Sequence, residues 1–144
     1  MISKFSSYHP FFKYRIILLI LIIPIFIAGL TGDFYTGPGH EWFNGVLGDF
    51  LLPVFMILVI SFIFPRISPF HTALWVFVYN TAIEFTQLSE HPFLEAVRPT
   101  LFGRLVIGEY FSWDDIICYL AGCFTGWLLI YFIQNKFSSS KMSF

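Results

Sequence analysis

Three polar side chains recur on one face of an otherwise apolar segment. Asn80, Glu84 and Gln87 stand at positions i, i+4 and i+7, so they form one stripe if this segment is a helix. A carboxylate in such a stripe can act as a general base, or can orient a hydroxyl or amine group of a ligand. The same stripe is also typical of a buried hydrogen-bonded seam between helices. The residue types leave both interpretations open.

A second set of residues with chemical potential opens a later apolar segment. Asp114 and Asp115 come first, and Gly122 and Gly126 follow with the Gly-x-x-x-Gly spacing that favours close packing of membrane helices. Asp114 shares the glycine face, whereas Asp115 lies about 100° further round the helix, where it can face a cavity. Either aspartate can instead complement the positive end of the helix dipole.

Two arginines and a tryptophan lie near these acidic residues. Arg98 and Arg104 fall in the stretch before Asp115, and Trp113 comes directly before the two aspartates. A guanidinium binds a phosphate or carboxylate with two parallel hydrogen bonds, so both arginines are candidate ligand contacts. They can equally pair with nearby glutamates or with lipid headgroups. Trp113 fits an aromatic belt at the membrane surface and is a candidate for lining a pocket there.

The composition excludes most classes of protein. Of the 144 residues, 57% are hydrophobic and 12% are charged, and the net charge is −1. Ordinary globular domains are about 45–50% apolar and about 25% charged. A disordered chain and a polybasic nucleic-acid-binding protein are therefore excluded, and no nucleic-acid partner is expected. We predict a single integral membrane domain over residues 1–144.

Four apolar segments define the predicted elements. A spanning helix needs about 20 mainly apolar residues. We therefore predict an all-α polytopic membrane protein with four transmembrane helices, over residues 12–31, 46–64, 70–88 and 111–133. The stretch between the third and fourth helices mixes apolar residues with spaced charges, which predicts an outer loop that is partly embedded in the membrane.

The charged residues predict the orientation. Short loops rich in Lys and Arg mark the cytoplasmic side. Six of the eight basic residues fall on the side of the two termini: Lys4, Lys13, Arg15, Arg66, Lys136 and Lys141. Both termini are thus predicted to be cytoplasmic. All nine acidic residues then fall on the outer side or in the outer half of a span, including Asp49 near the start of the second helix.

Motifs for cofactors and metals do not occur in the sequence. There is no Walker loop, Gly-x-Ser-x-Gly elbow, His-Glu-x-x-His or Cys-x-x-Cys motif, so no cofactor and no metal site is predicted. Cys118 and Cys123 are five positions apart and point about 140° away from each other on a helix, which favours packing roles over a disulfide.

Three stretches resemble a bacterial family. They are Glu-Phe-Thr-Gln at 84–87, Leu-Glu-Ala-Val-Arg-Pro-Thr at 94–100 and Phe-Ser-Trp-Asp-Asp-Ile-Ile-Cys-Tyr-Leu-Ala-Gly at 111–122. In these stretches the chain resembles the small membrane proteins of domain of unknown function 2809 (DUF2809), and in layout it is similar to the wider VanZ-like group. The resemblance implies functional positions at Glu84, Gln87, Arg98 and Asp115, and a matching Gly-Asp pair at Gly48 and Asp49. An Asn found about one turn after the Asp in the wider group is replaced here, which weakens transfer of that group's link to glycopeptide resistance.

The polar residues at the outer side support three functional hypotheses. The first is an envelope protein that binds a lipid headgroup, a lipid-linked precursor or an envelope-directed small molecule through Glu84, Gln87, Arg98 and Asp115. The second is an intramembrane hydrolase or transferase acting on a lipid-linked substrate, with Glu84 and Asp115 as candidate catalytic residues. The third is a structural salt-bridge network in a protein whose function lies in a membrane partner or a homo-oligomer.

Overall fold

The computed structural model describes residues 9–89, 91–100, 103 and 111–138, and every regular element in these ranges is helical. The elements are α1 (His9–Phe34), α2 (His40–Trp42), the π-helical segment η2 (Phe43–Leu47), α3 (Gly48–Ile63), α4 (Pro69–Thr86), α5 (Pro92–Val97) and α7 (Trp113–Ser138). The all-α class is confirmed.

Three helical stretches are long and apolar enough to cross a membrane. They are Phe11–Gly32, His40–Ile63 and Trp113–Phe137, and the second joins α2, η2 and α3. The protein is therefore a membrane protein by the length and composition of its helices. The predicted segment 70–88 corresponds to α4, which has 18 residues. It is not among these apolar helices, because Thr72, Asn80 and Glu84 make it more polar.

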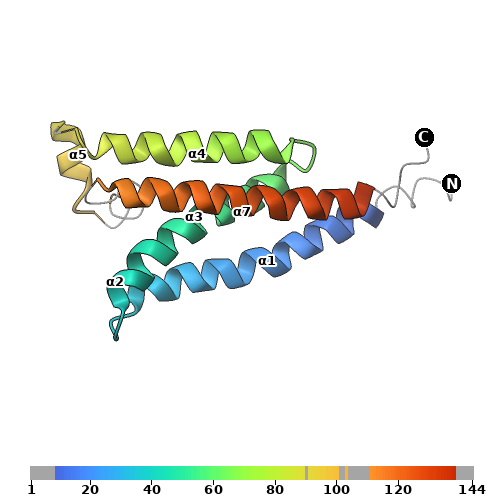
Figure 1. Cartoon of the computed structure of the whole chain (residues 1–144), viewed down its shortest axis with the longest axis horizontal. Coiled ribbons are helices and arrows are strands. Elements are labelled where there is room, and N and C mark those ends of the chain that lie inside the picture. The colour runs from blue at the N-terminus through green and yellow to red at the C-terminus, as the bar shows by residue number, and fades with distance from the viewer. Residues whose placement is uncertain (1–8, 90, 101–102, 104–110, 139–144) are drawn as a thin grey trace.

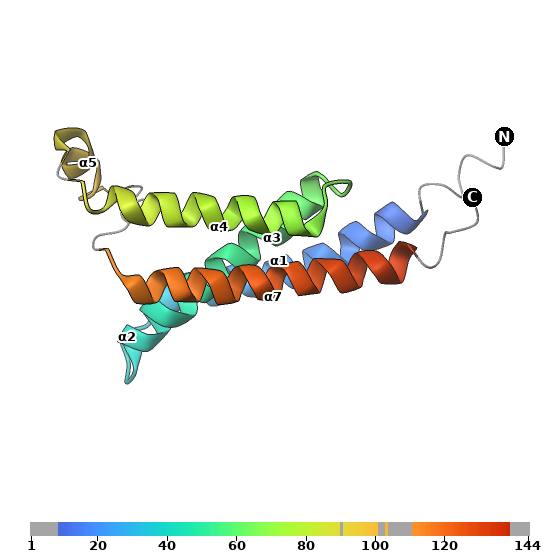
Figure 2. The same cartoon turned by 45° about the horizontal axis from the view of Figure 1, so that its top comes forward.

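The long helices pack in one bundle, and successive long helices run in opposite directions (Figure 1). The main contacts join α3 with α7, α4 with α7, α1 with α3 and α3 with α4. The start of α1 and the end of α7 lie at one end, whereas α2 and α5 lie at the other, as the turned view also shows (Figure 2). Buried apolar side chains from all four long helices form the core, among them Leu18, Ile57, Leu58, Val76 and Ile130. We call the end that carries α2 and α5 the acidic end, because Asp49, Glu84 and Asp115 lie on the helix termini there.

The polar side of α4 faces the inside of the bundle. Thr72, Asn80 and Glu84 are buried, with relative exposures of 3%, 4% and 0%. The exposed large hydrophobic side chains of the same helix are Phe70, Leu74, Trp75, Val78, Tyr79 and Phe85. Polar groups that face the interior and apolar groups that face outward are the arrangement expected of a helix surrounded by lipid.

The glycine stripe of α7 lets this helix approach α3 closely. A Cβ atom added at Gly122 would collide with the Phe50 carbonyl oxygen and would lie 2.6 Å from the Pro53 ring. One added at Gly126 would lie 2.8 Å from the Ile57 side chain. The close packing predicted from the Gly-x-x-x-Gly spacing is confirmed.

The helix from His40 to Ile63 contains a change of winding. Gly39 starts it from a left-handed conformation with φ of 76°, and residues Phe43–Leu47 then form a π-helix. In an ordinary α-helix Asn44 and Asp49 would point about 140° apart. The wider i→i+5 winding brings them toward one side of the helix.

Candidate functional site

Glu84 is the most buried acidic residue in the described chain, and its carboxylate joins two helices. Oε1 accepts a hydrogen bond from the Ser112 backbone N–H at 2.8 Å. Oε2 accepts from Gln87 Nε2 at 3.1 Å and from the Tyr119 hydroxyl at 3.4 Å. These three donors are neutral; Ser112 directly precedes α7, and Tyr119 lies in its second turn. Hydrogen bonds to Glu84 therefore connect the end of α4 with the beginning of α7.

The Tyr119 hydroxyl binds the Glu84 carboxylate, and two further carboxyl groups lie near it. Asp49 on α3, Glu84 on α4 and Asp115 on α7 all lie close enough to Tyr119 for their charges to act on it. The Asp115 carboxyl also interacts directly with that of Glu84. Two ionised carboxylates at this range repel each other, so a proton or a cationic group between them stabilises the arrangement. The sequence prediction that the acidic residues meet at one end holds for these three.

The remaining member of the α4 stripe has a local role. Asn80 Nδ2 donates to the Val76 carbonyl at 2.8 Å and lies 3.6 Å from the Met56 sulfur. Asn80 is thus satisfied one turn away from the carboxyl groups, within the packing of α4 against α3. The predicted stripe exists, but only Glu84 and Gln87 belong to the cluster around Tyr119.

Arg98 contacts the end of α4 in the described structure. Its Nη2 donates to the carbonyl oxygens of Thr86 at 3.3 Å, Gln87 at 3.0 Å and Ser89 at 3.2 Å. The last carbonyl groups of a helix lack partners within the helix, and a cation there also favours the helix dipole. This nitrogen therefore caps the end of α4, and the contact of Arg98 with an anionic group stays a prediction.

Trp113 lies outside this cluster. Trp113 is 67% exposed, and its ring packs edge to face against Phe85 and Phe111, with centroids 6.3 Å and 5.1 Å apart. It belongs to an aromatic group at the outside of the acidic end, as expected for a membrane-surface belt. Arg104 lies outside the described residues, together with the end of the predicted embedded loop at 104–110, whereas its first part contains α5.

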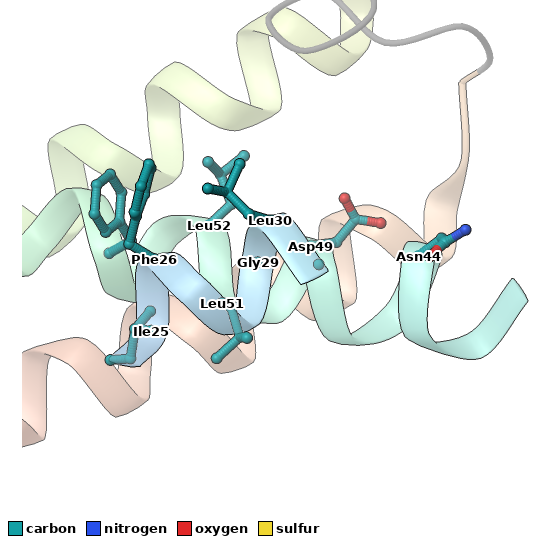
Figure 3. A pocket seen from close by; sticks show the side chains of 10 residues that line it. Ile25, Phe26, Gly29, Leu30, Asn44, Asp49, Leu51 and Leu52 are labelled. Atoms are coloured by element: carbon teal, nitrogen blue, oxygen red, sulfur yellow. The ribbon is translucent and has the colours of Figure 1, made fainter. Parts of the chain in front are cut away.

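A groove lies between α1 and α3 beside this cluster (Figure 3). Its volume is about 330 Å³, and Asp49 and Asn44 line its polar part. The other lining residues are Ile25, Phe26, Gly29, Leu30, Gly48, Leu51, Leu52 and Phe55. Sequence reasoning missed this groove and Asn44, because the π-helical winding that brings Asn44 beside Asp49 leaves no signal in the apolar pattern.

The chain matches a known protein family. The family described as "Protein of unknown function (DUF2809)" matches residues 39–123, more than half of the chain. The chain belongs to this family. The matched region of the DUF2809 chain includes α3, α4, α5 and the first part of α7, and so includes the carboxyl cluster. Helix α1 precedes it. No solved structure matches the chain.

The DUF2809 site offers hydrogen-bond acceptors and negative charge. Asp49 and Asp115 are partly exposed, whereas Glu84 is fully buried and is occupied by donors of the chain itself. Among the described residues, no group of three or more His, Cys, Asp or Glu side chains is arranged to hold a metal ion. The chemistry that this site supports is recognition of a group that donates hydrogen bonds or carries positive charge.

Proposed function

We propose that this DUF2809 protein binds the headgroup of a membrane lipid or of a lipid-linked envelope precursor at its acidic end. The observation that supports the proposal is the position of Glu84, hydrogen-bonded to Ser112 and Tyr119 between α4 and α7, with the partly exposed Asp49 and Asp115 near it at the same end of the bundle. A charged side chain within a span costs about 2.5–3.5 kcal/mol at the bilayer centre, so such residues face the bundle interior or a wet cavity and are paired. A ligand with ammonium or hydroxyl groups provides such a partner.

Binding is favoured over catalysis by the position of Glu84. A general base has to reach the proton that it removes, and Glu84 is 0% exposed, with donors of the chain on both oxygens. The partly exposed Asp49 and Asp115 contact the ligand in this proposal, while Glu84 holds Tyr119 and the start of α7 in position.

The proposal includes a single bacterial inner-membrane domain with four spans and α4 as the third of them. The apolar outer face of α4 and its position between α3 and α7 support this. An 18-residue helix is about 27 Å long, close to the hydrocarbon thickness of about 30 Å. The six basic residues on the side of the termini support a cytoplasmic position for both ends.

The orientation predicts a difference in labelling between two loop positions. In a background with both native cysteines replaced by alanine, Thr36→Cys and Ser68→Cys place single thiols at opposite ends of the bundle. An impermeant maleimide added to intact cells is expected to label position 36 and not position 68, because only the acidic end faces outward. Labelling of position 68 alone would show the opposite orientation.

Replacing Asp115 is expected to weaken lipid binding, whereas replacing its neighbour is not. The protein is reconstituted into nanodiscs with equal parts of phosphatidylethanolamine, phosphatidylcholine and phosphatidylglycerol, and retained lipid is measured by native mass spectrometry. We expect one headgroup to be enriched over the bulk mixture. Asp115→Asn should reduce that enrichment about tenfold, which corresponds to about 1.4 kcal/mol.

Asp114→Asn is the matched control, because it removes the same charge from the adjacent, exposed position. The proposal fails if wild-type protein retains lipids in the bulk ratio. It also fails if the two substitutions change retention equally.

A further inference from the structure

The groove between α1 and α3 has a polar end and an apolar end. Asn44 and Asp49 line it near the acidic end of the bundle, beside Leu30 and Gly48. Deeper along α1 and α3, Phe26 and Phe55 stack with ring centroids 5.6 Å apart. Figure 3 shows the Asp49 carboxylate at one side of the groove and the Phe26 ring at the other. Polarity therefore falls from the acidic end of the bundle toward its middle.

This gradient matches an amphiphile that lies along the bundle. A lipid in a bilayer has its headgroup at the surface and its chains toward the centre, and the groove has its acid and its apolar residues in the same order. The groove volume of about 330 Å³ lies within the range of about 300–1,000 Å³ that is usual for small-molecule sites. Such a space holds a headgroup and the first part of one chain.

The residues at the polar end select the chemistry of the headgroup. A carboxylate repels phosphate and carboxylate groups, and it forms short, strong hydrogen bonds with ammonium groups. Asp49 has interactions within the protein, but a carboxylate offers about four acceptor positions on its two oxygens. Asn44 is the other polar residue of the lining. A primary ammonium group has three N–H donors that can bind these acceptor positions, whereas a quaternary ammonium group has no N–H donor.

We propose that the groove between α1 and α3 holds an amphiphile with a primary amine, with the ammonium group on Asp49 and Asn44 and an acyl chain along Phe26 and Phe55. This deepens the proposed function and rests on it, since Asp49 belongs to both the groove and the carboxyl cluster. It also gives α1, which lies outside the matched family region, one wall of the binding site.

The test compares two lipids that differ only in methylation of the amine. Nanodiscs contain equal parts of dioleoyl phosphatidylethanolamine and dioleoyl phosphatidylcholine, and the retained ratio is measured by native mass spectrometry. Wild-type protein is expected to retain the primary amine about tenfold over the quaternary amine. Asp49→Asn should bring this ratio close to one, because the negative charge is lost while the shape is kept.

A second variant fills the groove without touching the carboxyl groups. Gly29 lines the groove and a Cβ atom added there meets nothing within 4 Å, so Gly29→Leu is expected to place its side chain in the groove. Retention of both lipids should fall about tenfold. Gly45→Leu is the control, because Gly45 also has open space and does not line the groove.

The outcomes separate this inference from the proposed function. Retention that depends on Asp115 but is unchanged by Asp49→Asn and Gly29→Leu would overturn the groove and leave headgroup binding at the acidic end in place. Equal retention of the two lipids by wild-type protein would overturn the selection of a primary amine. Loss of all selective retention, with Asp115→Asn also without effect, would overturn both.

Discussion

Replacing Glu84 with alanine is expected to destabilise the protein by about 1–3 kcal/mol, because neutral donors lose their acceptor between two packed helices. The Ser112 N–H, the Gln87 amide and the Tyr119 hydroxyl would all lose their acceptor in a buried site. A buried donor without a partner costs about 1–3 kcal/mol. The contact between α4 and α7 would open first, because Glu84 joins those two helices at the acidic end.

The stability change can be measured through a native thiol. Cys123 is 4% exposed and free, so it reacts with a thiol-specific dye only when the bundle opens. In a Cys118→Ala background, Glu84→Ala should react at a clearly lower temperature than the parent. An unchanged transition would show that the Glu84 hydrogen bonds do not hold α4 against α7.

Glutamine at position 84 is the control for charge. Its carbonyl oxygen can still accept from Ser112, and its amide nitrogen can donate to Asp115. Glu84→Gln should therefore lose less than half of the stability that alanine loses. Under the proposed function it should also retain lipid better than Asp115→Asn, because Glu84 is a positioning residue and Asp115 contacts the ligand.

Leucine at Gly122 is expected to prevent the close crossing of α3 and α7. The added side chain would begin against the Phe50 backbone carbonyl and the Pro53 ring, neither of which can move like a flexible side chain. Overpacking by even a few methylene groups costs about 1–3 kcal/mol. We expect about this loss for Gly122→Ala and little folded protein for Gly122→Leu, measured as monodisperse yield in detergent and by the Cys123 transition.

Gly29→Ala is the matched control inside another long helix. Nothing lies within 4 Å of its added Cβ, and alanine in a helix is favoured over glycine by about 0.5–1 kcal/mol. Its transition should be unchanged or higher. If Gly122→Ala behaved in the same way as Gly29→Ala, α7 would not approach α3 as closely as described.

The long helices were predictable because their causes are local. An unbroken run of apolar residues of spanning length has to form a helix in lipid, since every backbone N–H and C=O must be paired within the segment. The predicted ranges 12–31, 46–64 and 111–133 fall within or largely overlap α1, the helix from His40 to Ile63, and α7. The Gly122 and Gly126 spacing likewise predicted a contact that the bundle contains.

For the segment 70–88, the pattern of residues along the chain could not predict which way the polar side chains face. Its polar residues make α4 less apolar than the other three long helices, and only the packing shows that they face inward. The stripe predicted Glu84 and Gln87 as neighbours, which they are. It could not show that Ser112 and Tyr119 would complete the site, because they lie 28 and 35 residues away in sequence.

The sequence by itself determined the membrane class, the helices and the gathering of acidic residues toward one end. It did so because hydropathy and helical periodicity are properties of residues and their near neighbours. Only the tertiary structure decided what each polar group contacts. It placed Arg98 on the last carbonyl groups of α4, Tyr119 on the Glu84 carboxylate, and Asp49 beside Asn44 in an apolar groove. These contacts depend on how separate helices pack against each other and on the π-helical segment. The spacing of residues along one helix does not predict either of them.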